Sequence, residues 1–162
     1  MNGAFTHNPS AMIVYRVTRK KFAGDMTGEG ARRNGGRWNH ILTPCLYTSE
    51  TRALAILEFS VNTDLSRIPP DCVMVTIEVP EDSLMQIKVE KLPPDWFSNP
   101  YPDATQNLGT LVLNESDISV LAVPSSVVHE EWNYILNPRT MPPGWPKIVQ
   151  IAPLFYDIRI KR

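Results

Sequence analysis

Three side chains with functional chemistry follow one another at intervals of about ten residues: Arg37, Tyr47 and Glu58. Glu58 interrupts the otherwise apolar residues 53–59. Because a carboxylate that is desolvated without a partner is costly, we expect Glu58 to face a cleft or a cation. Arginine offers a fork of donors that fits phosphate oxygens, and a tyrosine ring can stack on a planar group. The three residues therefore indicate a cleft for a phosphate-bearing ligand.

Glycines are concentrated just before Arg37, where four of ten residues are of this type: Gly28, Gly30, Gly35 and Gly36. Glycine allows positive φ and lets backbone N–H groups approach a ligand. A dinucleotide fingerprint would need glycine where Arg33 stands, and a Walker loop would need lysine where Gly36 stands. An EF-hand that began at Asp25 would need glutamate at the same Gly36. The glycine loop therefore belongs to none of these three classes.

The chain of 162 residues has a net charge of −1, but its positive charge is concentrated near the N-terminal end. Residues 1–37 carry seven basic and two acidic side chains, whereas the remainder carries nine basic and fifteen acidic ones. We therefore expect the glycine loop to be electropositive, which suits phosphate. Nucleic acid is the alternative ligand, but no helix-turn-helix, zinc-finger or aromatic RNA-binding pattern accompanies these basic residues.

The sequence predicts neither a metal site nor a membrane span. His129-Glu130-Glu131 lacks the second histidine of a zincin motif, and Cys45 and Cys72 are isolated thiols that suit reduced core positions. The chain has no apolar run of 18 residues and no signal-peptide pattern at its start. We expect a cytoplasmic protein.

Glu58 is predicted to lie on a helix over residues 50–62. Thr48 or Ser49 can cap this helix through a side-chain oxygen. Apolar residues at helical spacing predict its buried stripe: Leu54, Leu57 and Val61. Glu58 borders that stripe and would therefore lie at the edge of the core.

The other predicted elements are mostly strands. Arg16 lies within the first of them, and Ser125 and Ser126 follow the end of a buried one. The strands are predicted over residues 12–18, 72–79, 83–89, 118–123, 133–138 and 148–160, the last as one or two strands, and another begins at Trp38. Residues 83–89 would pair with 72–79. A second helix is predicted over residues 103–115, and proline-rich loops over 91–102 and 141–146. The fold class is α+β, a single compact domain over residues 12–162 with mixed or antiparallel sheets and a few helices, preceded by a flexible tail over residues 1–11.

The order of these motifs resembles the RES domain, which is named for its arginine, glutamate and serine and is known as the toxin of RES–Xre toxin–antitoxin pairs. The matching segments are Tyr15-Arg16 and residues 28–31, 35–39, 44–49, 53–58, 123–127 and 133–138. They cover most of the chain in order, and the cluster around Arg37 is the most specific. The residues after Asn137-Pro138 depart from the family pattern, because Arg139 and Thr140 stand where many relatives carry a histidine–proline pair.

The resemblance implies a fold similar to that of ADP-ribosyltransferases and cleavage of NAD⁺ at the nicotinamide–ribose bond. NAD⁺ would be the substrate, inorganic phosphate a possible co-substrate, and no cofactor or metal would be needed. The implied catalytic residues are Arg37, Tyr47, Glu58 and Ser125, and the implied substrate-binding residues are Arg16, Gly36, Arg37, Tyr47 and Asn133. Within these sets the arginines would hold the dinucleotide, Tyr47 would position the nicotinamide ribose, and Glu58 would stabilise the ribosyl cation. The implied partner is a helix-turn-helix antitoxin of the Xre type in an oligomeric complex, without direct contact of this chain with nucleic acid or membrane.

Alternatives remain at both the residue and the functional level. Arg16 could be a strand-edge residue, Tyr47 a core residue, Glu58 a surface ion-pair residue, and Ser125 a turn residue next to the equally placed Ser126. The acceptor of the ADP-ribosyl group could be phosphate, water or a protein, the last making the chain a protein-modifying ADP-ribosyltransferase. The alternative outside the enzymes is an inactive domain that binds a partner.

Overall fold

The computed structural model describes residues 10–161, which contain seven strands and three α-helices. The strands are β1 (Ala11–Arg19), β2 (Leu46–Ser49), β3 (Cys72–Pro80), β4 (Leu84–Gln86), β5 (Val120–Pro124), β6 (Trp132–Leu136) and β7 (Lys147–Pro153). The helices are α1 (Glu29–Asn34), α2 (Arg52–Val61) and α3 (Asp103–Glu115). One sheet contains all the strands in the order β4-β5-β6-β2-β1-β3-β7, and only the β4–β5 pair is parallel.

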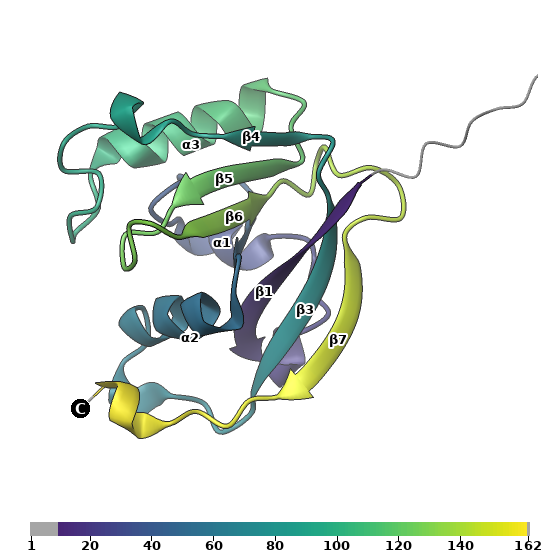
Figure 1. Ribbon diagram of the computed structural model, residues 1–162, viewed down its shortest axis with the longest axis vertical. Coiled ribbons are helices and arrows are strands. Elements are labelled where there is room, and N and C mark those ends of the chain that lie inside the picture. The colour runs from purple at the N-terminus through teal and green to yellow at the C-terminus, as the bar shows by residue number, and fades with distance from the viewer. Residues whose placement is uncertain (1–9, 162) are drawn as a thin grey trace, which may run out of the picture.

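The sheet has two halves that run in different directions (Figure 1). Strands β4, β5, β6 and β2 form one half, and the longer strands β1, β3 and β7 form the other. The halves are joined by a single residue pair, Tyr15 of β1 with Ser49 of β2, whereas β1 and β3 pair along their whole length. Because β1 and β2 separate on either side of that pair, side chains from both strands can line a cleft between the halves.

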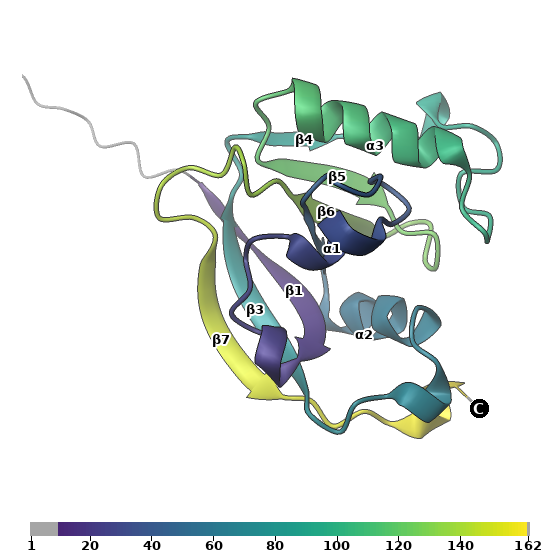
Figure 2. The same ribbon diagram turned by 180° about the vertical axis from the view of Figure 1, so that it is seen from behind.

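The helices cover both sides of this split sheet. Helix α2 lies nearer the viewer in Figure 1, whereas α1 and α3 lie nearer the viewer in the reverse view of Figure 2. The sheet has two apolar cores. The first core contains Val14, Val75 and Ile77 from the long strands together with Leu46, Val120 and Leu136 from the short ones, and the second contains Trp38, Trp96 and Leu121 with α3 packed against them.

Most of the predicted architecture is confirmed. The chain is a compact α+β domain with a mixed sheet, helix α3 occupies the predicted residues 103–115, and the strands over 12–18, 72–79 and 118–123 agree with β1, β3 and β5 to within two residues. The proline-rich segments 91–102 and 141–146 contain no strand or α-helix, as expected. The predicted tail falls mostly on residues 1–9, which lie outside the described residues, and β1 begins at Ala11.

The prediction of a strand at Trp38 is wrong. Arg37 and Trp38 lie at the centre of a tight turn that is closed by a hydrogen bond from Gly36 N–H to Asn39 O, 2.9 Å long. Trp38 is buried in the second core, and α3 passes so close that a Cβ on Gly109 would lie 2.0 Å from Trp38 O. Packing against α3 therefore replaces the expected strand pairing.

Helix α1 occurs where only a glycine loop was predicted. Glu29 in its first turn forms ion pairs with Arg32 and Arg33, three and four residues later, with N–O distances of 2.6 Å each. Such pairs stabilise a helix. A carboxylate near the N-terminus of a helix also interacts favourably with the helix dipole. The Glu29 carboxylate also neutralises part of the positive charge of Arg32 and Arg33.

Three further predictions are corrected. Strand β4 pairs in parallel with β5 rather than with β3, because Ser83 O accepts hydrogen bonds from both Ser119 N–H and Val120 N–H and so holds β4 beside β5. The cap of α2 is Thr51, whose Oγ1 accepts from Leu54 N–H at 3.0 Å, whereas Thr48 and Ser49 lie in β2. Val61 is 58% exposed and does not belong to the core stripe of α2.

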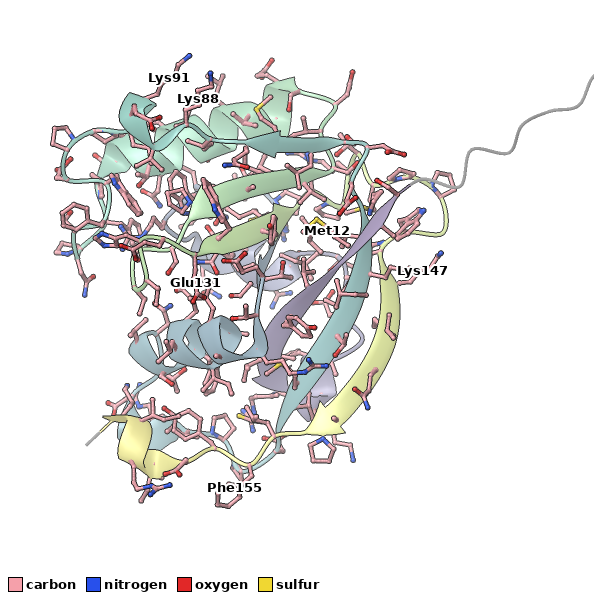
Figure 3. All side chains as sticks on the ribbon, in the orientation of Figure 1. Met12, Lys88, Lys91, Glu131, Lys147 and Phe155 are labelled. Carbon is pink, nitrogen blue, oxygen red and sulfur yellow. The ribbon has the colours of Figure 1, made fainter. Side chains whose placement is uncertain are left out.

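The C-terminal segment, predicted as one or two strands over residues 148–160, contains one, since β7 ends at Pro153 and a 3₁₀ helix (Ile158–Lys161) follows. Strand β7 forms one edge of the sheet, and Lys147 and Phe155 extend from its two ends in Figure 3. Among residues 10–161, no helix is both long and apolar enough to span a bilayer.

Candidate active site

A cleft with two lobes lies where the two halves of the sheet separate. The smaller lobe has a volume of about 380 Å³ and the larger about 610 Å³. Both lobes are lined by Gly35, Tyr47, Glu58, Asn62 and Asn133. Because these residues line both, the lobes adjoin one another, and Glu58 lies at their junction.

Glu58 lies at this junction because α2 packs against the sheet through Leu54 and Ala55, which are buried. One turn after Leu54, the half-buried Glu58 carboxylate receives two hydrogen bonds on the same oxygen. Ser125 Oγ donates to Oε1 at 2.7 Å, and Asn133 Nδ2 donates to Oε1 at 2.5 Å. Among the described residues Oε2 has no hydrogen-bond partner, so it is available to a ligand.

Asn133 is oriented by a third hydroxyl. Ser49 on β2 donates to Asn133 Oδ1 at 2.7 Å, and the two residues are paired across β2 and β6. Asn133 Nδ2 is therefore directed at Glu58, and the carboxylate is fixed by a chain of hydrogen bonds that begins in the sheet. This chain makes a mobile surface ion pair for Glu58 the poorer interpretation, since no salt bridge to Glu58 occurs in the described part of the chain.

Ser125 is fully buried and follows Pro124 at the end of β5. Its Oγ accepts from Val127 N–H and Val128 N–H, both at 3.0 Å, while donating to Glu58. It lines neither lobe, whereas the adjacent Ser126 lines the larger one. The geometry therefore favours Ser125 as a residue that positions Glu58, not as one that touches the ligand.

Tyr47 on β2 lines both lobes through its ring. Its hydroxyl donates to Asn39 Oδ1 at 2.8 Å and accepts from Trp38 N–H at 3.0 Å. Burial raises the pKa of the Tyr47 hydroxyl well above its ordinary value, so the side chain is neutral. A Cβ at Gly36 would lie 2.6 Å from Tyr47 Oη, which explains why only glycine fits beside this ring.

Arg37 lines the larger lobe from the turn before Asn39. Its Nη1 donates to Trp96 O at 2.7 Å and to Ser98 O at 3.0 Å, so the side chain also fastens the loop after residue 92. Burial lowers the pKa of the guanidinium, and the nearby Glu58 carboxylate acts in the opposite direction. Nε and Nη2 have no hydrogen-bond partner among residues 10–161 and remain available as a donor pair.

Arg16 lines the smaller lobe from β1. Its Nη1 donates to Asp25 O at 3.1 Å, burial lowers the pKa of the guanidinium, and the Asp25 carboxylate opposes that shift. The two arginines that were expected to hold the dinucleotide therefore line different lobes. Gly28, Gly30 and Gly35 line the smaller lobe beside Arg16.

Sequence reasoning missed the roles of Asn39 and Ser49. Asn39 is fully buried, and its Nδ2 donates to three backbone carbonyls, those of Ala31, His40 and Thr43. It thereby holds the Tyr47 hydroxyl against the α1 segment. The signal was present in the Arg37-Trp38-Asn39 motif, but a buried asparagine that supports another side chain has no periodicity that would reveal it.

The arrangement can bind an elongated ligand that carries negative charge and develops positive charge at its centre. One guanidinium in each lobe suits anionic groups, and a fixed carboxylate at the junction suits a cation that forms there. Within residues 10–161, no three His, Cys, Asp or Glu side chains are grouped as metal ligands. Cys45, near the smaller lobe, is buried, which raises the pKa of its thiol to about 12.

Comparison with known proteins groups the chain with a known family. Residues 13–158 match the family model described as the RES domain. The chain is 34% identical over 128 residues to Toxin Res of Photorhabdus laumondii, covering 78% of this chain and 82% of that toxin. It is 32% identical over 143 residues to the Prs ADP-ribosylating toxin of a Sphingobium species, covering 86% and 89% of the two chains.

A solved structure agrees with this grouping at the level of fold. A chain from the crystal structure of the M. tuberculosis MbcT–MbcA toxin–antitoxin complex superposes with a TM-score of 0.72, covering 90% of this chain and 85% of that chain. Sequence identity in this superposition is 21%, so the match establishes a common fold.

Proposed function

Because the chain belongs to the RES domain family, we propose that it is the toxin of a toxin–antitoxin pair and that it cleaves NAD⁺ at the nicotinamide–ribose bond. The observation that carries the proposal is the Glu58 carboxylate at the junction of two lobes, each lined by one arginine. NAD⁺ has the matching chemistry, since its reactive ribose lies between a planar cationic group and a diphosphate. Depletion of NAD⁺ in the cell would arrest growth.

The proposed reaction starts with cleavage of the bond between ribose C1′ and the nicotinamide nitrogen. The bonding electron pair passes to that nitrogen, nicotinamide leaves as a neutral molecule, and positive charge develops on the ribose. Glu58 stabilises this oxocarbenium-like centre by its negative charge, in a site where the carboxylate is already oriented. An oxygen of phosphate or water then forms the new bond to C1′, and the nucleophile loses its proton to solvent.

Ser125 and Asn133 support this step without contacting the reacting atoms. Both donate to Glu58 Oε1, which orients the carboxylate and leaves Oε2 without a hydrogen-bond partner in the described part of the chain. Tyr47, neutral and held by Asn39, provides a planar wall for the nicotinamide ribose. The free donor pair of Arg37 binds the diphosphate in the larger lobe, while Arg16 lines the smaller lobe.

Product analysis tests the proposal and identifies the acceptor. Purified protein is incubated with NAD⁺ with and without inorganic phosphate, and the products are separated by chromatography. A phosphorylase yields nicotinamide and ADP-ribose 1″-phosphate only when phosphate is present, whereas a hydrolase yields ADP-ribose at a rate that phosphate does not change. The absence of nicotinamide release under either condition, from folded protein, would refute NAD⁺ cleavage by the protein alone.

Transfer of ADP-ribose to a protein is the second candidate, and the relative named Prs ADP-ribosylating toxin favours it. The same cleft and the same oxocarbenium chemistry would serve, with a protein side chain as the nucleophile. In this case label from adenine-marked NAD⁺ appears on a protein band when lysate is added. Free ADP-ribose as the dominant product, with no labelled band, argues against transfer.

The proposed partner is a helix-turn-helix antitoxin that occludes the cleft. The related fold in the MbcT–MbcA toxin–antitoxin complex supports an antitoxin partner. A small helix-turn-helix gene beside the gene for this chain would be the first evidence, followed by co-purification and loss of NAD⁺ turnover in the complex. An inactive partner-binding domain would instead bind that protein and show no turnover when free.

A further inference from the structure

Two aromatic side chains line the larger lobe although they are largely solvent-exposed. Phe97 is 45% exposed and Tyr101 is 38% exposed, and both belong to the irregular segment between β4 and α3. Exposed aromatic rings on the wall of a cavity are common where a planar ligand stacks.

The segment that carries them is held in place before any ligand binds. Arg37 Nη1 fastens it through Trp96 O and Ser98 O, and Trp96 itself is buried in the second core. The rings of Trp96 and Phe97 both pack on His129, with centroid distances of 5.2 and 4.8 Å. Phe97 is therefore supported on one side, while it lines the lobe.

Positive charge lies beside these rings. The guanidinium carbon of Arg37 is 5.6 Å from the centroid of the Tyr101 ring, and Arg37 retains a free donor pair among the described residues. A ligand that joins a flat base to a diphosphate would place its base against the rings and its phosphates toward Arg37. An adenosine diphosphate group has this combination.

We propose that Phe97 and Tyr101 form an aromatic subsite for the adenine ring of the substrate. The inference rests on the proposed function, and it assigns the ADP half of NAD⁺ to the larger lobe and nicotinamide to the smaller one. The volumes agree with this orientation, since about 610 Å³ is available to the larger half and about 380 Å³ to the smaller. Glu58, shared by both lobes, then lies at the ribose that joins nicotinamide to the diphosphate.

Binding of AMP, nicotinamide mononucleotide and NAD⁺ to Phe97→Leu and Tyr101→Leu tests the subsite by calorimetry. Each variant should bind AMP and NAD⁺ about tenfold more weakly than the wild type, because base–aromatic stacking contributes to that extent. Affinity for nicotinamide mononucleotide, which lacks adenine, should stay unchanged. Tyr101→Phe keeps the ring and should bind AMP normally, and Phe155→Leu is the matched control, since Phe155 is exposed but lines neither lobe.

Two results would overturn the inference. Unchanged AMP affinity in both leucine variants would show that the rings do not contact adenine, and an equal loss for nicotinamide mononucleotide would assign them to the nicotinamide half. These outcomes do not depend on turnover. A wild type that binds AMP through the rings yet releases no nicotinamide would refute the proposed reaction and leave the adenine subsite standing, whereas a wild type that binds neither AMP nor NAD⁺ would refute both.

Discussion

At the scale of single residues, the carboxylate of Glu58 is the group on which the proposed reaction depends. It is fixed by Ser125 and Asn133 through one oxygen, and the other oxygen has no hydrogen-bond partner among residues 10–161. A carboxylate held in this way loses little orientation freedom when the substrate binds. Its charge therefore acts in full on a cation that forms at the junction of the lobes.

Substitution Glu58→Gln removes this charge and keeps the shape. We expect NAD⁺ turnover to fall by roughly 10²-fold or more, while the protein stays folded. Nicotinamide release measures the effect, and circular dichroism confirms the fold. Glu115→Gln changes an exposed carboxylate at the end of α3 and should leave turnover unchanged. Wild-type turnover in folded Glu58→Gln would remove Glu58 from the mechanism.

Arg37 binds the loop and faces the larger lobe at the same time. Arg37→Lys keeps the positive charge but loses the planar fork, so NAD⁺ affinity should fall by about 1–3 kcal/mol. Calorimetric titration measures this change. Arg19→Lys is the control, because Arg19 is exposed and pairs only with Asp71 among the described residues. Equal affinities of the Arg37→Lys variant and the wild type would mean that Arg37 only supports the loop.

Ser125 is expected to act through Glu58. Ser125→Ala removes a donor to the carboxylate and an acceptor for two backbone N–H groups, so kcat should fall by about tenfold with a smaller change in KM. Ser126→Ala, next to it on the wall of the larger lobe, should leave kcat nearly unchanged. If Ser126→Ala lowered kcat and Ser125→Ala did not, the assignment of the two serines would be reversed.

At the scale of elements, the contact between α3 and the Arg37 turn fixes the larger lobe. Gly109 allows α3 to touch the backbone of Trp38, since a Cβ there would lie 2.0 Å from Trp38 O. The turn, the loop after residue 92 and α3 are therefore packed as one unit. Displacement of the helix would move Arg37 together with the aromatic wall.

Gly109→Ala should destabilise the protein by about 1–3 kcal/mol, because the methyl group forces α3 away from the turn. Urea denaturation measures the loss. Gly30→Ala is the matched control in α1, since a Cβ there meets no atom within 4 Å and alanine is the better helix former, so stability should rise by up to about 1 kcal/mol. Equal stability of the Gly109→Ala variant and the wild type would show that α3 is not pressed against Trp38.

At the scale of the whole molecule, two apolar cores support the sheet, and strands β5 and β6 contribute side chains to both. Two ionisable groups, Cys45 and Tyr47, are buried beside the smaller lobe of the cleft. Burial raises the pKa of Cys45 to about 12 from an ordinary value of 9.0, and it raises the pKa of Tyr47 well above 10.0. Both groups are neutral in the folded protein at neutral pH.

Folding stability should therefore decrease in alkaline solution. Above pH 9 the unfolded chain releases protons that the folded protein still holds, so the unfolding free energy falls as pH rises, by at most about 1.4 kcal/mol per pH unit for each group. The contribution of these two groups to stability is fully present below their pKa values in the unfolded chain. It is lost as pH rises through their pKa values in the folded protein. Urea midpoints at pH 8 and pH 10.5 measure the difference, and the double variant Cys45→Ala, Tyr47→Phe should show a smaller one. An equal pH dependence of the double variant and the wild type would contradict this account.

Patterns along the chain were enough to predict the α+β class, the strands β1, β3 and β5, the helix α3, and a cleft near Arg37, Tyr47 and Glu58. The alternation of apolar and polar residues, the positions of prolines and the helical spacing of apolar residues are local properties. They can be recognised without knowing how the elements pack against one another. The family resemblance supplied the ligand, because the residues alone indicated only a phosphate-bearing one. Glu58 was identifiable because a carboxylate in an apolar helix is conspicuous in any sequence.

Tertiary structure alone decided how those residues work together. Trp38 was predicted to begin a strand, but its backbone forms a tight turn that packs against α3 at Gly109. Arg16 and Arg37 were both expected to hold the dinucleotide, yet β1 and the turn over residues 36–39 place them in different lobes. Ser125 and Asn133 meet Glu58 across 67 and 75 residues of chain, and Phe97 and Tyr101 reach the cleft through a loop without periodicity. Contacts of this kind depend on packing between distant segments, which no local pattern encodes.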